Sequence, residues 1–257
     1  MGALPLPVLK AQLGSLYSTF HQEAFRAHDP VSIVWAYIHP ADQEIVGLWA
    51  ALFAWGRREV ALRKVRQLLS LIDPSPGRAV RELQRLPPIP WAHRTWSPTD
   101  IQDLWQALHL LYKREHSLAN FFWKRRHDWE GAIAAFQEAI LREAPHLQRH
   151  IGYLRKGSAS KRLLLWLRWM IRRDCIDPGP WEGFSPAWLF TPIDVHVFRW
   201  MRAHSLIPYR SLSWRAVCAL TSVFRTLSPG DPLRYDFALV TAGALGYLTP
   251  PLPTETE

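Results

Sequence analysis

The chain has 257 residues, of which 48% are hydrophobic and 21% are charged. This is the composition of a globular protein that can bury a core, so it excludes a largely disordered chain. The longest apolar stretches, 45–55 and 237–248, are shorter than the roughly 20 residues that cross a bilayer. We therefore expect a soluble cytoplasmic protein with no membrane association.

Positive charge is in excess, because 31 Lys and Arg residues face 22 Asp and Glu residues, for a net charge of +9. Such an excess in an otherwise ordinary chain indicates a polyanionic partner. Of the 31 basic residues 25 are arginines, whose planar guanidinium suits phosphate and hence nucleic acid. A soluble protein that is basic only through genome composition remains the alternative.

Apolar residues recur at three- and four-residue spacing along most of the chain, and period-two alternation is nearly absent. This pattern predicts an all-α fold. Capping residues support several helix starts, namely Ser97 or Thr99, Ser213, and Asp231 followed by Pro232. The predicted helices are 8–28, 42–55, 58–72, 99–124, 129–142, 161–173, 195–204, 213–227 and 233–247.

Two proline-rich stretches, 73–98 and 174–192, interrupt the helical pattern. We expect both to be loops, the second ordered and held by Trp181 and Trp188. Residues 1–248 then form one domain, and the Pro, Thr and Glu content of 249–257 predicts a disordered tail.

Cys175 and Cys218 are the only cysteines, which excludes a four-cysteine zinc site or an iron–sulfur cluster. Both thiols are expected to stay reduced in an intracellular chain. His146 and His150 have the i, i+4 spacing of a zinc-binding pair, but no third ligand is indicated. We therefore expect a solvated histidine pair and no metal.

The segment KGSASKRLLLWLRWMIR, residues 156–172, reads as a short turn that opens directly into a helix. Ser158 or Ser160 is expected to cap this helix, whose first backbone N–H groups can bind a phosphate oxygen. Lys161 falls in the first helical turn, where the positive end of the helix dipole favours the neutral, nucleophilic amine. A plain phosphate-binding or solvated lysine is the alternative.

The segment TPIDVHVFRW, residues 191–200, places Asp194 just before another apolar helix. The commonest role of an aspartate in this position is to cap the helix N-terminus, worth about 1 kcal/mol. His196 lies two residues further on and therefore points away from the helix face that carries Asp194. Asp194 and His196 thus make a poor pair of metal ligands.

Together these two segments resemble the helix-hairpin-helix (HhH-GPD) DNA glycosylases, and among them the oxoguanine glycosylases. The shared features are a glycine-containing hairpin, a Ser-Lys pair opening an apolar helix, and a Pro-x-Asp-Val-His string. The segments LRWMIRRDCIDPGPW and DPLRYDFAL are also similar to an uncharacterised bacterial and archaeal branch of that superfamily. The resemblance covers about residues 30–248 and implies a two-lobed helical fold with the active-site cleft between the lobes.

On this resemblance Lys161 matches the nucleophilic lysine and Asp194 the essential aspartate. LWAALFAWGRR, residues 48–58, is similar to the helix that leads to the residue filling the emptied base stack, here Arg57. Asp236 and Phe237 resemble a wall of the base pocket. The resemblance also implies DNA contacts by the hairpin and by the next helix, through Gly157, Ser158, Ala159, Ser160 and His196.

The sequence departs from the family pattern in two places. Ala159 stands where the hairpin usually has a second glycine, and it fits if its φ stays negative. The 174–192 loop lengthens the segment between lysine and aspartate and can reshape the base pocket. Asp174 and Asp177 compete with Asp194 for the catalytic role, but ion pairing with neighbouring arginines is the simpler interpretation.

The resemblance implies a base-excision-repair DNA glycosylase and AP lyase that removes an oxidised purine, most simply 8-oxoguanine. Its partner is double-stranded DNA with a damaged base, and we expect a nucleoid-associated monomer without cofactor, metal or obligate protein partner. One alternative is a non-catalytic DNA- or RNA-binding helix-hairpin-helix protein, and another is a basic helical adaptor. A mere binder needs neither Lys161 nor Asp194, which favours the enzyme.

Overall fold

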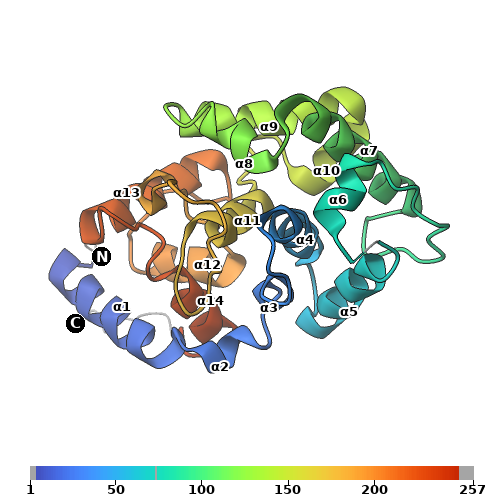
Figure 1. The fold of residues 1–257 in the computed structure, drawn as a ribbon. Coiled ribbons are helices and arrows are strands. Elements are labelled where there is room, and N and C mark those ends of the chain that lie inside the picture. Colours follow the sequence, from blue (N-terminus) through green and yellow to red (C-terminus); the bar gives the residue numbers. More distant parts are fainter. Residues whose placement is uncertain (1–3, 73, 249–257) are drawn as a thin grey trace.

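The computed structural model describes residues 4–72 and 74–248, and this part of the chain is helical (Figure 1). It contains no β-strand, only two isolated bridges, which confirms the predicted all-α class. None of its helices has both the length and the apolar character needed to cross a membrane. The tail predicted for 249–257 lies outside the described residues.

Most helices follow one another with short connections, and the long connections are 82–97 and 172–194. In chain order the α-helices are α1 (Leu6–Phe20), α2 (Glu23–Arg26), α3 (Val31–Val34), α4 (Pro40–Phe53), α5 (Arg58–Leu69), α6 (Pro76–Arg81), α7 (Pro98–Glu115), α8 (Leu118–Trp123), α9 (Trp129–Glu143), α10 (Gln148–Ile151), α11 (Lys161–Ile171), α12 (Val195–Ala203), α13 (Trp214–Leu227) and α14 (Asp236–Ala244). Three 3₁₀ turns, η1 (Pro145–Leu147), η2 (Leu154–Lys156) and η3 (Pro186–Trp188), lie between them.

Helix α4 runs through the middle of the fold and is apolar on all sides. Its residues 45–53 are buried, and it packs against α3, α5, α6 and α11 (Figure 1). Gly47 lets α11 approach closely, because a Cβ there would lie 2.8 Å from the side chain of Met170. A helix that is apolar all round is stable only inside a protein, so α4 and α11 together form the centre of the core.

One carboxylate lies within this core. Glu44 accepts hydrogen bonds from the Tyr112 hydroxyl, from the indole N–H of Trp181 at 3.0 Å, and from the backbone N–H groups of Leu118 and Ala119 at 3.1 Å. Burial raises the pKa of Glu44, whereas these four donors oppose the rise. Through Trp181 the carboxylate anchors the 174–192 loop, as the sequence predicted for that tryptophan.

The structure confirms two predicted caps and corrects a third. Ser97 and Asp100 form a reciprocal capping box at the start of α7, and the Ser213 hydroxyl accepts from the backbone of α13 at 3.4 Å. The start predicted at Asp231 is wrong, because α14 begins only at Asp236. Asp231 instead accepts a hydrogen bond from the backbone N–H of Leu233, which forms a turn before the helix. It also pairs with Arg172.

Three predicted segment boundaries are also wrong. The helix predicted for 8–28 ends at Phe20, and the one predicted for 99–124 is broken at His116, which adopts a left-handed φ of 67°. Ser117 then caps the separate helix α8. The predicted loop 73–98 contains α6, which starts with a proline at its first position. Periodicity cannot detect such breaks, because the apolar spacing continues across them.

Candidate functional site

A cavity of about 390 Å³ lies where several helix ends meet. The segment after α4, the first residues of α11 and α12, and one side of α14 line it. Five of the residues predicted for the site lie on its wall, namely Lys161, Asp194, His196, Asp236 and Phe237. The sequence analysis thus selected residues that are distant in the chain and adjacent in the fold.

Lys161 and Asp194 face each other in this cavity. The Nζ of Lys161 lies 3.9 Å from the Oδ2 of Asp194, with the lysine side chain 41% exposed and the aspartate side chain 10% exposed. Solvent therefore reaches the amine while the carboxylate is fixed in the wall. At this separation the two groups form an ion pair, and a small movement of the lysine side chain brings them within the hydrogen-bond distance that proton transfer needs.

The turn before Lys161 presents this residue at the very start of α11. Gly157 has a φ of +82°, which only glycine adopts without strain, and Ser160 has a left-handed φ of 46°. Ala159 does not have a positive φ, which is the condition under which an alanine fits this position of the turn. The left-handed residues of the turn are thus Gly157 and Ser160, and the second of them lies one position after the alanine.

The predicted cap of α11 is wrong. Neither the Ser158 nor the Ser160 hydroxyl accepts a hydrogen bond from the backbone of this helix. The Ser158 hydroxyl accepts instead from the backbone N–H of Ser160 at 3.2 Å. Without a side-chain cap, the first backbone N–H groups of α11 remain available to an anion.

Gln137 in α9 holds the turn in place, which the sequence analysis did not predict. Its amide nitrogen donates to the Ser160 hydroxyl at 2.8 Å and to the carbonyl of Ile151 at 3.1 Å, and its oxygen accepts from the backbone N–H of Leu154 at 2.9 Å. The side chain is fully buried. A glutamine on a helix gives no sequence signal of such a role, since most glutamines are exposed.

Asp194 uses its two carboxylate oxygens for different purposes. Oδ1 accepts from the backbone N–H of Val197 at 2.8 Å, which confirms the predicted N-cap of α12. Oδ2 faces Lys161. The cap therefore fixes the carboxylate without consuming the oxygen that points at the amine.

Asp236 is a second buried carboxylate in the cavity wall. Its Oδ2 accepts from the guanidinium of Arg168 at 2.6 Å, while its Oδ1 is buried and has no hydrogen-bond partner among the described residues. Burial raises the pKa of Asp236 to about 6, against the lowering effect of Arg168. Phe237, its neighbour, is also buried and lines the cavity.

Arg57 is exposed at the start of α5 but does not line the cavity. The adjacent Trp55, Gly56 and Arg58 do line it. Trp55 is 42% exposed, and the Arg162 guanidinium lies 5.3 Å from its ring. An exposed tryptophan at the mouth of a cavity is a stacking surface that the sequence analysis did not distinguish from the many core tryptophans.

Asp174 and Asp177, the alternatives to Asp194 for the catalytic role, form ion pairs. Asp177 accepts from both Arg168 and Arg172, and Asp174 pairs with Arg172 at 2.9 Å. The hydrogen bond with His21 and the charge of Arg172 hold the pKa of Asp174 well below its usual range, against the effect of burial. The ion-pair interpretation is therefore confirmed for both.

The prediction that His146 and His150 form a solvated pair is wrong. His150 is fully buried, and its ring stacks on that of Trp96 with centroids 3.8 Å apart. His146 is partly exposed and contacts Asp100 and Asp103. Burial lowers the pKa of His150 to about 4, although Asp100 acts in the opposite direction.

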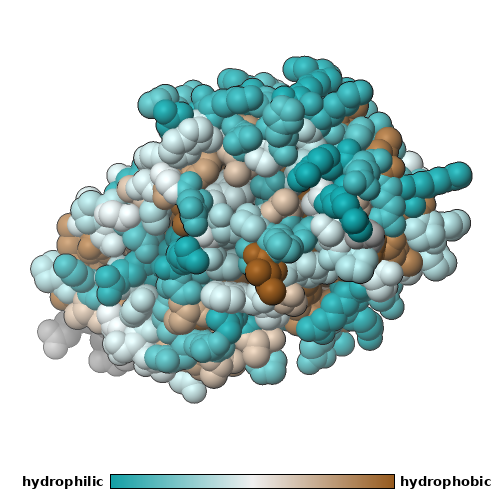
Figure 2. Space-filling view, viewed as in Figure 1, coloured by the Kyte–Doolittle hydropathy of each residue, from teal (hydrophilic) through white to brown (hydrophobic). Residues whose placement is uncertain are grey.

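Hydrophilic side chains cover most of the face shown in Figure 2, and apolar groups appear there only as small separate areas. On this face the protein has no broad apolar surface of the kind that marks a protein or membrane interface.

The fold and this cavity define an all-helical protein with a lysine and a carboxylate facing each other where two helices begin. The family model described as a protein of unknown function (DUF2400) matches residues 29–245, and the chain belongs to that family. The match includes every residue of the site described above but not α1. No curated protein and no solved structure matches the chain.

Proposed function

We propose that this protein is a DNA glycosylase with AP lyase activity that removes an oxidised purine, in the first place 8-oxoguanine. The observation that carries the proposal is the 3.9 Å separation of the Lys161 amine and the Asp194 carboxylate in a cavity. A solvent-accessible amine beside a fixed carboxylate is the pair that Schiff-base chemistry on a sugar requires.

The arrangement of the helices supports the two-lobed part of the proposal. One wall of the cavity comes from the segment after α4 and from α5, and the other from α11, α12 and α14. We assign these two groups of helices to the two lobes and the cavity to the cleft between them. The hairpin is the turn 157–160 between η2 and α11.

The chemistry follows from these groups. A base within duplex DNA is inaccessible, so the damaged nucleotide must leave the stack, at a cost of a few kcal/mol. The neutral Lys161 amine attacks the sugar C1′, and the bond from C1′ to the base breaks with its electron pair leaving on the base. Asp194 stabilises the positive charge that develops on the sugar and accepts the proton lost by the attacking nitrogen.

Asp194 then passes its proton to the ring oxygen as the bond from that oxygen to C1′ breaks, and the nitrogen lone pair forms a protonated imine between Lys161 and the opened sugar. The imine makes the C2′ proton acidic. Removal of this proton breaks the bond from C3′ to its oxygen, and the strand is cut at the phosphate. Water releases the enzyme by hydrolysing the imine, so the lysine is regenerated.

Positive groups near the cavity offset the cost of base extrusion. The uncapped start of α11 can bind a phosphate, Arg58 lines the cavity, and Arg57 is exposed beside it at the start of α5. In this proposal Arg57 or its neighbour Trp55 occupies the space left by the extruded base, and Phe237 and Asp236 contact that base. His196, on the cavity wall, contacts the DNA strand beside it.

Borohydride trapping tests the proposal directly, because it reduces the imine to a stable amine that links protein and DNA. The full chain is incubated with duplexes that carry 8-oxoguanine, other oxidised purines or an abasic site, and with an undamaged duplex as control. We expect a covalent adduct with a lesion duplex and with the abasic duplex, and none with undamaged DNA.

Absence of an adduct with every lesion and with the abasic site would refute the enzyme. If binding to DNA or RNA then persisted, the non-catalytic binding protein would be the better interpretation.

A further inference from the structure

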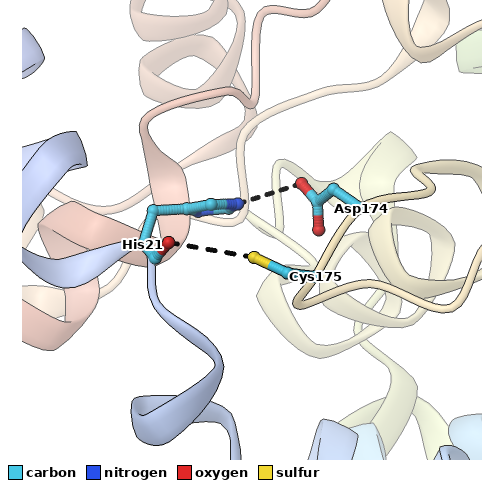
Figure 3. A group of neighbouring side chains, drawn as sticks. All are labelled: His21, Asp174 and Cys175. Carbon is cyan, nitrogen blue, oxygen red and sulfur yellow. Dashed lines mark hydrogen bonds and ion pairs between the residues drawn. The ribbon is translucent and has the colours of Figure 1, made fainter.

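A group of three potential metal ligands lies away from the cavity. His21, Asp174 and Cys175 each contribute one ligand atom, and these atoms lie within 4.8 Å of one another. The Nε2 of His21 is 3.1 Å from the Oδ2 of Asp174, and the Cys175 thiol lies 3.8 Å from the carbonyl oxygen of His21 (Figure 3). His21 directly follows α1, whereas the other two residues begin the 174–192 loop.

We propose that His21, Asp174 and Cys175 bind a divalent cation of the zinc type. An imidazole nitrogen, a carboxylate oxygen and a thiolate sulfur form a donor set that borderline-soft cations prefer and that Ca²⁺ and Mg²⁺ do not. Bonds of about 2.0–2.3 Å put the ligand atoms of a tetrahedral zinc site about 3.3–3.8 Å apart. The present separations run from 3.1 Å between His21 and Asp174 to at most 4.8 Å, so only small side-chain movements are needed. Cys175 is exposed, which leaves the fourth position to water.

Binding exchanges protons for metal bonds. The thiol of Cys175 releases its proton to solvent, and the hydrogen bond between His21 and Asp174 is replaced by two bonds to the cation. The imidazole then carries its proton on Nδ1, a buried atom that has no hydrogen-bond partner among the described residues. No oxidation or reduction is involved.

The surrounding charges favour a cation in spite of the nearby arginine. Arg172 lies 2.9 Å from the Oδ2 of Asp174, but it also pairs with Asp177 and Asp231. It therefore keeps two carboxylate partners when Asp174 turns toward a metal ion. Arg168 and Arg172 together face four carboxylates, those of Asp174, Asp177, Asp231 and Asp236, so this network has an excess of negative charge.

Arg26, which lies beside Cys175, is already engaged. Its guanidinium pairs with Glu23 and donates to the backbone carbonyl of Cys175.

The cation would connect the N-terminal helix to the cavity wall. The His21 ring stacks on Tyr17 of α1 with centroids 4.4 Å apart, and it meets the ring of Phe237 edge-on at 5.9 Å. Phe237 lines the cavity on its other side. The site is thus structural, and its existence does not depend on the glycosylase proposal.

Metal titration of the full chain tests this site. Protein freed of metal with a chelator is titrated with Zn²⁺ by calorimetry and with Co²⁺ by absorption spectroscopy. We expect one tight equivalent per chain, and with Co²⁺ a thiolate-to-cobalt charge-transfer band together with the visible bands of a tetrahedral ion.

Cys175→Ser is the decisive variant, because an exposed thiol can be replaced without disturbing the core. It should lose the charge-transfer band and bind Zn²⁺ at least about tenfold more weakly, since even the loss of an outer-shell partner has that effect. Cys218→Ser is the matched control and should behave as wild type. Zn²⁺ should raise the melting temperature of wild type and of the control, but not that of Cys175→Ser.

Two results would overturn the proposal. One is the absence of tight binding to the wild-type chain. The other is equal Zn²⁺ affinity of wild type and Cys175→Ser, which would assign the ion to other residues.

Discussion

The amine of Lys161 lies 3.9 Å from Oδ2 of Asp194 although each residue stands at the start of a different helix. Two helix N-termini therefore converge on one cavity. Both concentrate positive electrostatic potential there, which favours an anionic ligand.

Lys161→Gln should abolish borohydride trapping while binding to duplex DNA persists. The glutamine keeps a polar end, one bond shorter than the lysine, but has no nucleophilic amine. Lys156→Gln is the matched control, because Lys156 is the exposed lysine just before the same turn, and it should trap at the wild-type level. An adduct retained by Lys161→Gln would identify another amine as the nucleophile.

Asp194→Asn separates the two roles of this carboxylate. The amide oxygen can still accept from Val197, so we expect the free energy of unfolding to change by less than about 1 kcal/mol. Without a negative charge beside the sugar, excision should slow by about 10² or more. Asp194→Ala loses the cap as well, and its melting temperature should fall. If single-turnover excision by the asparagine variant slows by less than about tenfold, Asp194 is only a cap.

Duplex binding should weaken steeply as salt increases, because each phosphate contact releases counterions. Arg57→Ala should lower the affinity and reduce the slope of log K against log salt by about 1. Fluorescence anisotropy with an abasic duplex measures both quantities. Binding that is insensitive to salt would instead favour the basic helical adaptor.

The buried His150 should make the protein less stable as the pH falls from about 6.5 to about 4. In the folded chain burial and the neighbouring Arg149 and Arg162 lower the pKa of this ring to about 4, against the effect of Asp100. The unfolded chain binds the proton near pH 6.5, so it gains protons first and stability drops by at most about 1.4 kcal/mol per pH unit.

Urea unfolding of wild type and His150→Gln at pH values across this window measures the effect. Whatever the glutamine costs at neutral pH, its stability should fall less steeply between about pH 6.5 and 5. Parallel curves for the two proteins would show that His150 does not titrate in this way.

Gln137→Leu should destabilise the protein by about 3 kcal/mol, because it leaves the carbonyl of Ile151 and the backbone N–H of Leu154 without their partner in a buried place and removes the donor to the Ser160 hydroxyl. It should also weaken duplex binding by loosening the turn before Lys161. Gln102→Leu changes an exposed glutamine of α7 and should shift stability by less than about 0.5 kcal/mol. Equal denaturation midpoints for the two variants would contradict the role assigned to Gln137.

Apolar periodicity is a local signal, so it was sufficient for the fold class. Several residues of the cavity were selected through the resemblance to the glycosylases. The sequence predicted the cap at Asp194 and the ion pairs of Asp177 from neighbouring residues alone. The break at His116 and the helix α6 escaped prediction, because left-handed residues and short helices within proline-rich segments leave no periodic trace. The roles of Gln137 and Trp55 depend on contacts with distant segments, which no local pattern encodes.

The buried carboxylate of Glu44 has a consequence for how the molecule opens. Its donors come from α7, from the start of α8 and from the 174–192 loop. Loss of any one of these hydrogen bonds leaves part of the negative charge of Glu44 without a partner in the core, at a cost of several kcal/mol. These three segments therefore detach from α4 in one cooperative step, and their amides should exchange with deuterium at a common rate.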